Sequence, residues 1–151
     1  MGGQDYLHGD ILRYNLSNRS KERRAGIDPR LIEISNRAIQ ITLIDFGIPE
    51  YGGKRTAMEQ NYLYTKDLSK CDGFLVLSNH QDGKALDFYA YVDGKASWDE
   101  AHLAIVGAAF LQAANELGYR VKWGGLWKRK TPKYLNGIPY GWDMPHIELL
   151  E

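Results

Sequence analysis

Apolar residues recur at helical spacing in the segment that follows residue 28. Leu31, Ile34 and Ala38 are three or four positions apart, so they lie on one face of a helix. Asp28 is a typical N-cap, and Pro29 suits the first helical turn because a backbone N–H there would be unpaired anyway. The pattern predicts an amphipathic helix that continues to about residue 42.

A longer apolar run follows Ser97. Ser97 and Glu100 have the spacing of a capping box, in which two side chains satisfy backbone N–H groups at a helix start. Gly118 is a typical helix stop, so we predict a long helix that ends just before it. Two shorter helices are predicted over residues 17–25 and 56–68.

Short runs of β-branched and aromatic residues predict strands between these helices. The Asp93-Gly94 pair is a hairpin signal, so the strand before it is expected to pair with an antiparallel neighbour. Helices and strands alternate without a regular β-α-β rhythm. We therefore predict an α+β fold in which a small, mostly antiparallel sheet packs against several helices. The predicted strands are residues 43–51, 73–77, 85–92, 120–123 and 147–150.

The composition is typical of one folded domain. Of the 151 residues, 44% are hydrophobic and 25% are charged, so we expect a single domain over residues 1–151 with a poorly patterned segment at 1–16. The 19 basic and 19 acidic residues give a formal net charge of zero, which argues against a nucleic-acid partner. The most apolar stretch, 103–117, is too short to span a bilayer, and no secretory signal is visible. We expect no membrane insertion.

Two histidines and an aspartate are candidate metal ligands. Asp87 interrupts the apolar strand at 85–92, where a carboxylate is costly unless it is paired or coordinated. His80 precedes this strand, and His146 stands at the start of the last one. Two imidazoles and one carboxylate leave the fourth position of a zinc ion open for water, as catalytic zinc sites require. From the residues alone, a salt-bridged Asp87 with two structural histidines is the alternative.

Cysteine and tryptophan lead to two further expectations. The single cysteine, Cys71, excludes an internal disulfide and a multi-cysteine zinc cluster, and we expect a small buried thiol. Trp127 and Trp142 flank a loop-rich segment. They either line a substrate groove or have a purely structural role.

Several motifs together resemble those of a known family. Residues 78–87 read S-x-H-x-x-G-x-A-x-D, and residues 143–146 read D-x-x-H. Residues 25–31 (AGIDPRL) and 123–127 (WGGLW) add to the similarity, which covers about 17–150. In these motifs the chain resembles zinc peptidases that cut bacterial cell-wall peptides, a group that includes VanY-like D-Ala-D-Ala carboxypeptidases and phage L-alanyl-D-glutamate endopeptidases.

The resemblance implies a fold of the zinc D,D-peptidase and hedgehog-like type and assigns a role to each matching residue. It implies Zn²⁺ as the cofactor. Asp143 matches the family's catalytic carboxylate, and an aspartate there favours the endopeptidase branch over the carboxypeptidases. Arg55 matches an arginine that faces the substrate carbonyl, and Ser78 matches a serine that contacts substrate. The implied zinc ligands are His80, Asp87 and His146.

The resemblance also implies a function. We expect a phage endolysin that hydrolyses the L-Ala–D-Glu bond of peptidoglycan stem peptides, with zinc-activated water and Asp143 as general base. The alternatives are a D-Ala-D-Ala carboxypeptidase and an inactive, metal-bearing wall-binding module. We expect a monomer with no separate wall-binding domain. It would stay in the host cytoplasm until the membrane is permeabilised and then reach the periplasm and cell wall.

Overall fold

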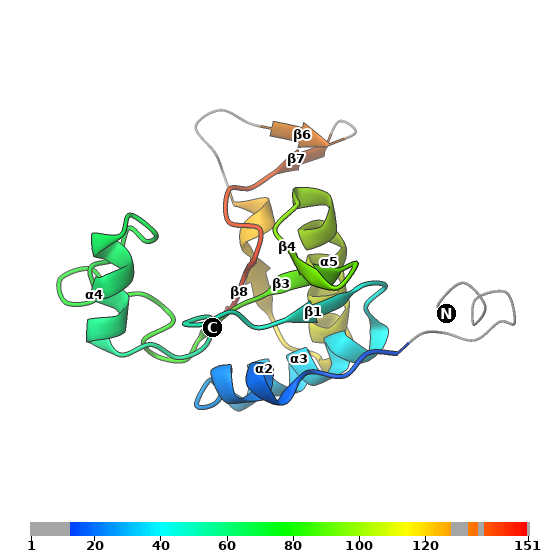
Figure 1. The fold of residues 1–151 in the computed structure, drawn as a ribbon, viewed down its shortest axis with the longest axis horizontal. Coiled ribbons are helices and arrows are strands. Elements are labelled where there is room, and N and C mark those ends of the chain that lie inside the picture. Colours follow the sequence, from blue (N-terminus) through cyan, green and yellow to red (C-terminus); the bar gives the residue numbers. More distant parts are fainter. Residues whose placement is uncertain (1–12, 128–132, 136–137, 151) are drawn as a thin grey trace, which may run out of the picture.

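The fold is known from a computed structural model that describes residues 13–127, 133–135 and 138–150. Its helices follow the predicted pattern closely. α3 starts at Pro29, and the carboxylate of its N-cap, Asp28, accepts the backbone N–H of Arg30. α4 lies at one side of the molecule, away from α3 and α5 (Figure 1). The helices within the described ranges are α2 (Asn18–Arg23), α3 (Pro29–Ile41), α4 (Ala57–Thr65) and α5 (Glu100–Leu117).

The strands form three small antiparallel sheets within the described part of the chain. One has the order β1-β3-β4, a second has the order β2-β8-β5, and β6 pairs with β7 alone. The α+β prediction is confirmed, although the β-structure is divided rather than gathered in one sheet. The strands are β1 (Asp45–Gly47), β2 (Ala85–Asp87), β3 (Tyr89–Val92), β4 (Lys95–Ser97), β5 (Val121–Trp123), β6 (Lys133–Leu135), β7 (Ile138–Tyr140) and β8 (His146–Leu149).

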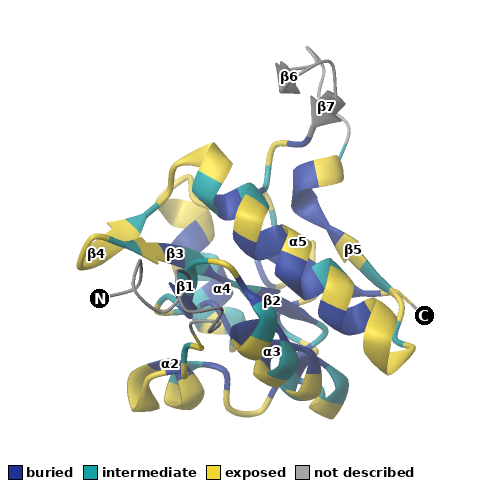
Figure 2. Cartoon of the chain, turned by 90° about the vertical axis from the view of Figure 1, so that its right-hand side faces the viewer, coloured by how far each residue is buried: buried dark blue, intermediate teal, exposed yellow. Residues whose placement is uncertain are grey.

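The core lies between α3, α5 and the two larger sheets. α5 packs against α3, and buried and exposed residues alternate along it, as expected for a helix with one apolar face (Figure 2). Phe110 of α5 is fully buried, and its ring centroid lies 4.8 Å from that of Phe88 and 5.0 Å from that of Phe46. These rings connect the helix to both larger sheets. No helix in the described ranges is long and apolar enough to cross a membrane.

The predicted start of α5 is wrong by two residues. Asp99, not Ser97, is the N-cap, and its carboxylate accepts the backbone N–H of Ala101. The Ser97 hydroxyl instead accepts the backbone N–H of Asp99 and bonds Nδ1 of His102. Both residue types are good N-caps, so the capping-box spacing alone could not decide between them.

The predicted strand at 85–92 is two strands in different sheets. β2 ends at Asp87 and pairs with β8, whereas β3 begins at Tyr89 and pairs with β1. The break falls at Phe88, whose backbone N–H donates to the carbonyl of Pro145 while its side chain enters the core. The chain therefore changes sheets directly after Asp87.

The predicted strand at 73–77 does not form. The four side chains from Phe74 to Leu77 are all more than half exposed, and Leu75 is 91% exposed. Asp72 accounts for the loop, because its Oδ1 accepts the backbone N–H groups of Phe74, Leu75 and Val76. A carboxylate that takes these donors leaves them unavailable for a β-ladder.

We predict that Phe110→Ala lowers the free energy of unfolding by about 3–5 kcal/mol, because it removes a buried ring from the centre of the core. Chemical denaturation would measure the change. Leu75→Ala is the matched control, since this exposed side chain should change stability by no more than about 0.5 kcal/mol. Similar losses for both variants would contradict the described core.

Candidate metal-binding and active site

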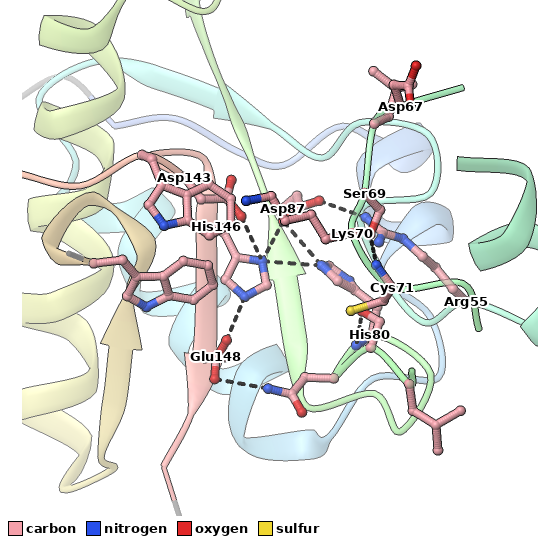
Figure 3. Close-up of a pocket in the computed structure, with 16 residues that line it drawn as sticks. Arg55, Asp67, Ser69, Lys70, Cys71, His80, Asp87, Asp143, His146 and Glu148 are labelled. Atoms are coloured by element: carbon pink, nitrogen blue, oxygen red, sulfur yellow. Dashed lines mark hydrogen bonds and ion pairs between the residues drawn. The ribbon is translucent and has the colours of Figure 1, made fainter. Parts of the chain in front are cut away.

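Three of the sequence-predicted residues meet at one point. Asp87 ends β2 and faces His146 of β8 in the antiparallel register, so the two side chains are cross-strand neighbours. His80 reaches them from the turn that precedes β2. One ligand atom from each of the three residues lies within 4.8 Å of the other two (Figure 3).

The spacing of these atoms fits a small tetrahedral cation. Asp87 Oδ1 lies 3.2 Å from His80 Nε2 and 3.0 Å from His146 Nδ1. The two ring nitrogens are 3.3 Å apart. Ligands held at roughly 2.0–2.1 Å by a tetrahedral zinc ion are about 3.3 Å from one another. The three residues could therefore hold a metal ion without rearrangement.

The other nitrogen of each ring has its own partner. His80 Nδ1 lies 2.8 Å from the carbonyl oxygen of Gly53, and His146 Nε2 lies 2.9 Å from Oε1 of Glu148. Both partners are acceptors, so each ring donates outward, and its other nitrogen, which faces Asp87, is the one left to coordinate a metal ion. Asn79 in turn donates to Oε2 of Glu148 at 2.9 Å. The orientation of both rings is thus set from outside the donor group.

Arg55 supports Asp87 from the opposite side. Its Nη2 donates to Asp87 Oδ2 at 2.9 Å, its Nη1 donates to Gln60 Oε1 at 2.9 Å, and its Nε donates to the carbonyl of Tyr51 at 2.6 Å. Burial lowers the pKa of Arg55, while the neighbouring Asp87 opposes this shift. A guanidinium has five N–H donors, so these three bonds leave donors for a further acceptor.

Asp87 and His146 form an ion pair that shifts the pKa of both groups. Burial would raise the pKa of Asp87, but the neighbouring His80 and His146 rings hold it well below its usual range. For His146, burial acts to lower the pKa, yet hydrogen bonds to Asp87 and Glu148 raise it to about 10. A metal ion and a proton therefore compete for Nδ1 of His146.

Asp143 stands beside the donor group. Its Oδ2 lies 3.9 Å from His146 Nδ1, and burial raises its pKa. The backbone carbonyl of Asp143 accepts from the N–H of His146 in a tight turn. The backbone N–H of Asp143 donates to the carbonyl of Gly124. A side chain at position 124 would overlap the Asp143 carbonyl, so this approach requires glycine.

Ser78 also lies at the site, but its hydrogen bond serves the turn. Its hydroxyl accepts the backbone N–H of His80 at 3.2 Å, while its own N–H donates to the side chain of Gln81. Ser78 therefore helps to place His80. It also lines the cleft described next, where a bound molecule could reach it.

An open cleft of about 580 Å³ lies over the donor group. Trp127 and Trp142 line it, with ring centroids 5.0 Å apart, so both tryptophans lie where the groove interpretation needs them. Cys71 also lines the cleft and is only half-buried, so the expected buried thiol is wrong. The cause is its place in the segment after α4, which forms one cleft wall rather than part of the core.

Sequence reasoning gave no role to several polar residues of this cleft, and Glu148 and Lys70 are the two that matter most for the site. Glu148 orients His146, and its signal was visible as a carboxylate two positions after a candidate ligand, where strand alternation places both on one face. Lys70 lines the cleft as well. Only the fold brings it there, because nothing in its local sequence marks it.

The fold and the donor group define a class: a small α+β domain with a candidate metal site at the floor of an open cleft. The family to which the chain belongs is that of the phage L-alanyl-D-glutamate peptidases, whose sequence model matches residues 12–150. The resemblance drawn from the motifs is thereby confirmed.

Two relatives illustrate the similarity. The L-alanyl-D-glutamate peptidase of Escherichia phage T5 is 33% identical over 146 residues, which cover 91% of this chain and 98% of the phage protein. The crystal structure of the Serratia marcescens L-Ala D-Glu endopeptidase ChiX superposes with a TM-score of 0.72 at 29% identity. The superposition covers 92% of this chain and 90% of ChiX.

We predict that Glu148→Ala weakens the affinity of the candidate site for a divalent metal ion, with zinc as the probe, about 10- to 100-fold, because His146 loses the acceptor that orients its ring. Competition with a chromophoric chelator would measure the affinity. Glu148→Gln keeps an oxygen acceptor and should retain most of the affinity, and the exposed Glu50→Ala should leave it unchanged. Wild-type affinity in Glu148→Ala would contradict the orienting role.

Proposed function

We propose that this protein is a zinc-dependent peptidoglycan endopeptidase of the phage endolysin type, which hydrolyses the L-Ala–D-Glu bond of cell-wall stem peptides. The observation that carries the proposal is the convergence of His80, Asp87 and His146 beside Asp143 in an open cleft. The named activities of the phage T5 and Serratia relatives support the choice of bond.

Zinc is the proposed metal because of the donor set. Two imidazole nitrogens and one carboxylate oxygen at these separations suit zinc better than Mg²⁺ or Ca²⁺, which prefer shells of oxygen ligands. When bound, zinc supplies Lewis acidity and brings the pKa of a water ligand close to neutrality. The ligands we propose are His80 Nε2, Asp87 Oδ1 and His146 Nδ1.

Asp143 is the proposed general base and acid. Its carboxylate lies close enough to the donor group to accept a proton from the attacking water and return it to the leaving amine. Desolvation disfavours the charged form of Asp143, which makes its carboxylate a stronger proton acceptor.

Arg55 and Ser78 have supporting roles in this proposal. The buried positive charge of Arg55, held beside Asp87, stabilises the negative charge that develops on the substrate carbonyl oxygen. Ser78 lines the cleft next to His80 and contacts the substrate backbone. Both residues also hold the metal ligands in place, so their substitution affects structure and catalysis together.

The proposal includes the setting in which the enzyme works. Its substrate is the bacterial cell wall, and the formal net charge of zero offers no general attraction for nucleic acid. We propose that it acts as a monomer. It remains in the host cytoplasm until another protein permeabilises the membrane, and it then reaches the wall.

We predict that the protein releases a new N-terminal D-glutamate from purified muropeptides, as detected by mass spectrometry. EDTA should abolish this cleavage and added zinc should restore it, because the chemistry depends on the metal. Release of free D-alanine instead would indicate a D-Ala-D-Ala carboxypeptidase. Full zinc occupancy with no cleavage would indicate a binding module.

We predict that Asp143→Asn lowers kcat by about 10²- to 10⁴-fold and leaves one zinc ion bound, because this residue moves a proton and holds no metal. His146→Ala should lose both bound zinc and activity. Metal content and turnover measured on the same preparations separate the two effects. Near-normal turnover of Asp143→Asn would exclude it as the base.

A further inference from the structure

The backbone of Lys70 belongs to one wall of the cleft, and its side chain extends towards Trp142 on the other wall. Lys70 belongs to the segment after α4 that also carries Ser69 and Cys71, and Figure 3 shows this segment facing Asp143 and His146 on the other wall. The Nζ atom of Lys70 lies 5.5 Å from the ring centroid of Trp142, within cation–π range. The ammonium group is therefore held next to the residue that directly precedes Asp143.

The charges around the cleft make this lysine unusual. The carboxylates that line it belong to Asp67, Asp87, Asp143 and Glu148, so the cleft is rich in negative charge. Apart from Lys70, the described lining contains one arginine and no other lysine. This arginine, Arg55, is already paired with Asp87. Among the described lining residues, Lys70 is the remaining lysine or arginine, and none of the described carboxylates forms an ion pair with it.

The substrate of the proposed reaction supplies an anion of its own. A glutamyl residue whose amine is in the scissile bond has two carboxyl groups. At most one of them continues the peptide, so a free carboxylate remains a few bonds from the leaving nitrogen. Glutamyl carboxylates are ionised at neutral pH. Arg55 compensates Asp87, but the other carboxylates of the cleft would disfavour this group unless a cation received it.

The position of Lys70 matches the position of this carboxylate. Asp143 is proposed to protonate the leaving amine, so the glutamyl residue lies on the Asp143 side of the metal site. Trp142, which holds the Lys70 ammonium, is on that same side. We propose that Lys70 binds the free carboxylate of the D-glutamyl residue and makes the cleft selective for acidic over amidated stem peptides. This inference rests on the proposed endopeptidase function.

The test compares two peptides that differ only at this group. Both contain the L-Ala–D-Glu bond. One has the free carboxyl group and the other has the corresponding primary amide. We expect the zinc-loaded wild type to favour the acidic peptide about five- to tenfold in kcat/KM, mainly through KM, which is the scale of one partly exposed ion pair.

Three variants assign this preference to Lys70. Lys70→Gln should bring the ratio of the two kcat/KM values close to one by lowering the value for the acidic peptide, and retained zinc binding would show that the variant is folded. Lys70→Arg should keep the preference. Lys66→Gln removes the same charge from the end of α4, where Nζ lies 5.7 Å from the Tyr62 ring centroid, and it should keep the wild-type ratio.

Two outcomes would overturn the inference, and they differ in what else they overturn. Equal cleavage of both peptides by wild type, or an unchanged ratio in Lys70→Gln, would remove the role of Lys70 and leave the endopeptidase function intact. Failure of the zinc-loaded wild type to cut either peptide, or intact muropeptides, would overturn the proposed function together with this inference.

Discussion

The carboxylate of Asp87 is the group on which the whole site depends. One of its oxygens contacts the His80 and His146 rings, and the other accepts from Arg55. A carboxylate in this position would be costly to desolvate without cationic partners. Two imidazoles and a guanidinium compensate for it, and the proposed metal ion would add a further positive charge. The partners that make a carboxylate tolerable at the end of this strand are therefore the same residues that form the site.

The backbone places Asp87 by a change of sheet. β2 pairs with β8 up to Asp87, and the chain then turns at the buried Phe88 to continue as β3 in the other sheet. Because Phe88 stacks on Phe110 at 4.8 Å between centroids, the core fixes the residue that adjoins the candidate metal site. Packing in the core and geometry at the donor group are thus linked through a single peptide bond.

The comparison of sequence and structure separates local from long-range information. Asp28 with Pro29, Gly118 and the Asp93-Gly94 turn are signals within a few residues, and the elements that they predict are present. The 73–77 run was misread because its apolar composition is strand-like, whereas the outcome depends on three backbone bonds to Asp72. The composition of residues 73–77 does not reveal that the Asp72 carboxylate competes with a β-ladder for these N–H groups.

The site shows the same division. The sequence alone could suggest His80, Asp87 and His146, because a polar residue beside an apolar strand is costly unless it is paired or coordinated. The resemblance of the motifs then indicated that the three residues act together. Their actual convergence depends on the β2–β8 register, which no local pattern encodes. Lys70 could not be found in this way, since it is an ordinary polar residue until the fold supplies its neighbours.

Gln60 shows how the cleft wall is tied to the cleft floor. It is fully buried, and it accepts from Arg55 while its amide donates to Ser69 Oγ and to the carbonyl of Cys71, each at 2.8 Å. Arg55 continues the chain of bonds to Asp87. A buried polar network is stable only when its members are satisfied, so a displaced wall segment would leave Gln60 and Arg55 with unpaired groups. The residue between Ser69 and Cys71 is Lys70. The network that ends at Asp87 therefore also holds the backbone of Lys70 in place relative to the candidate metal ligands.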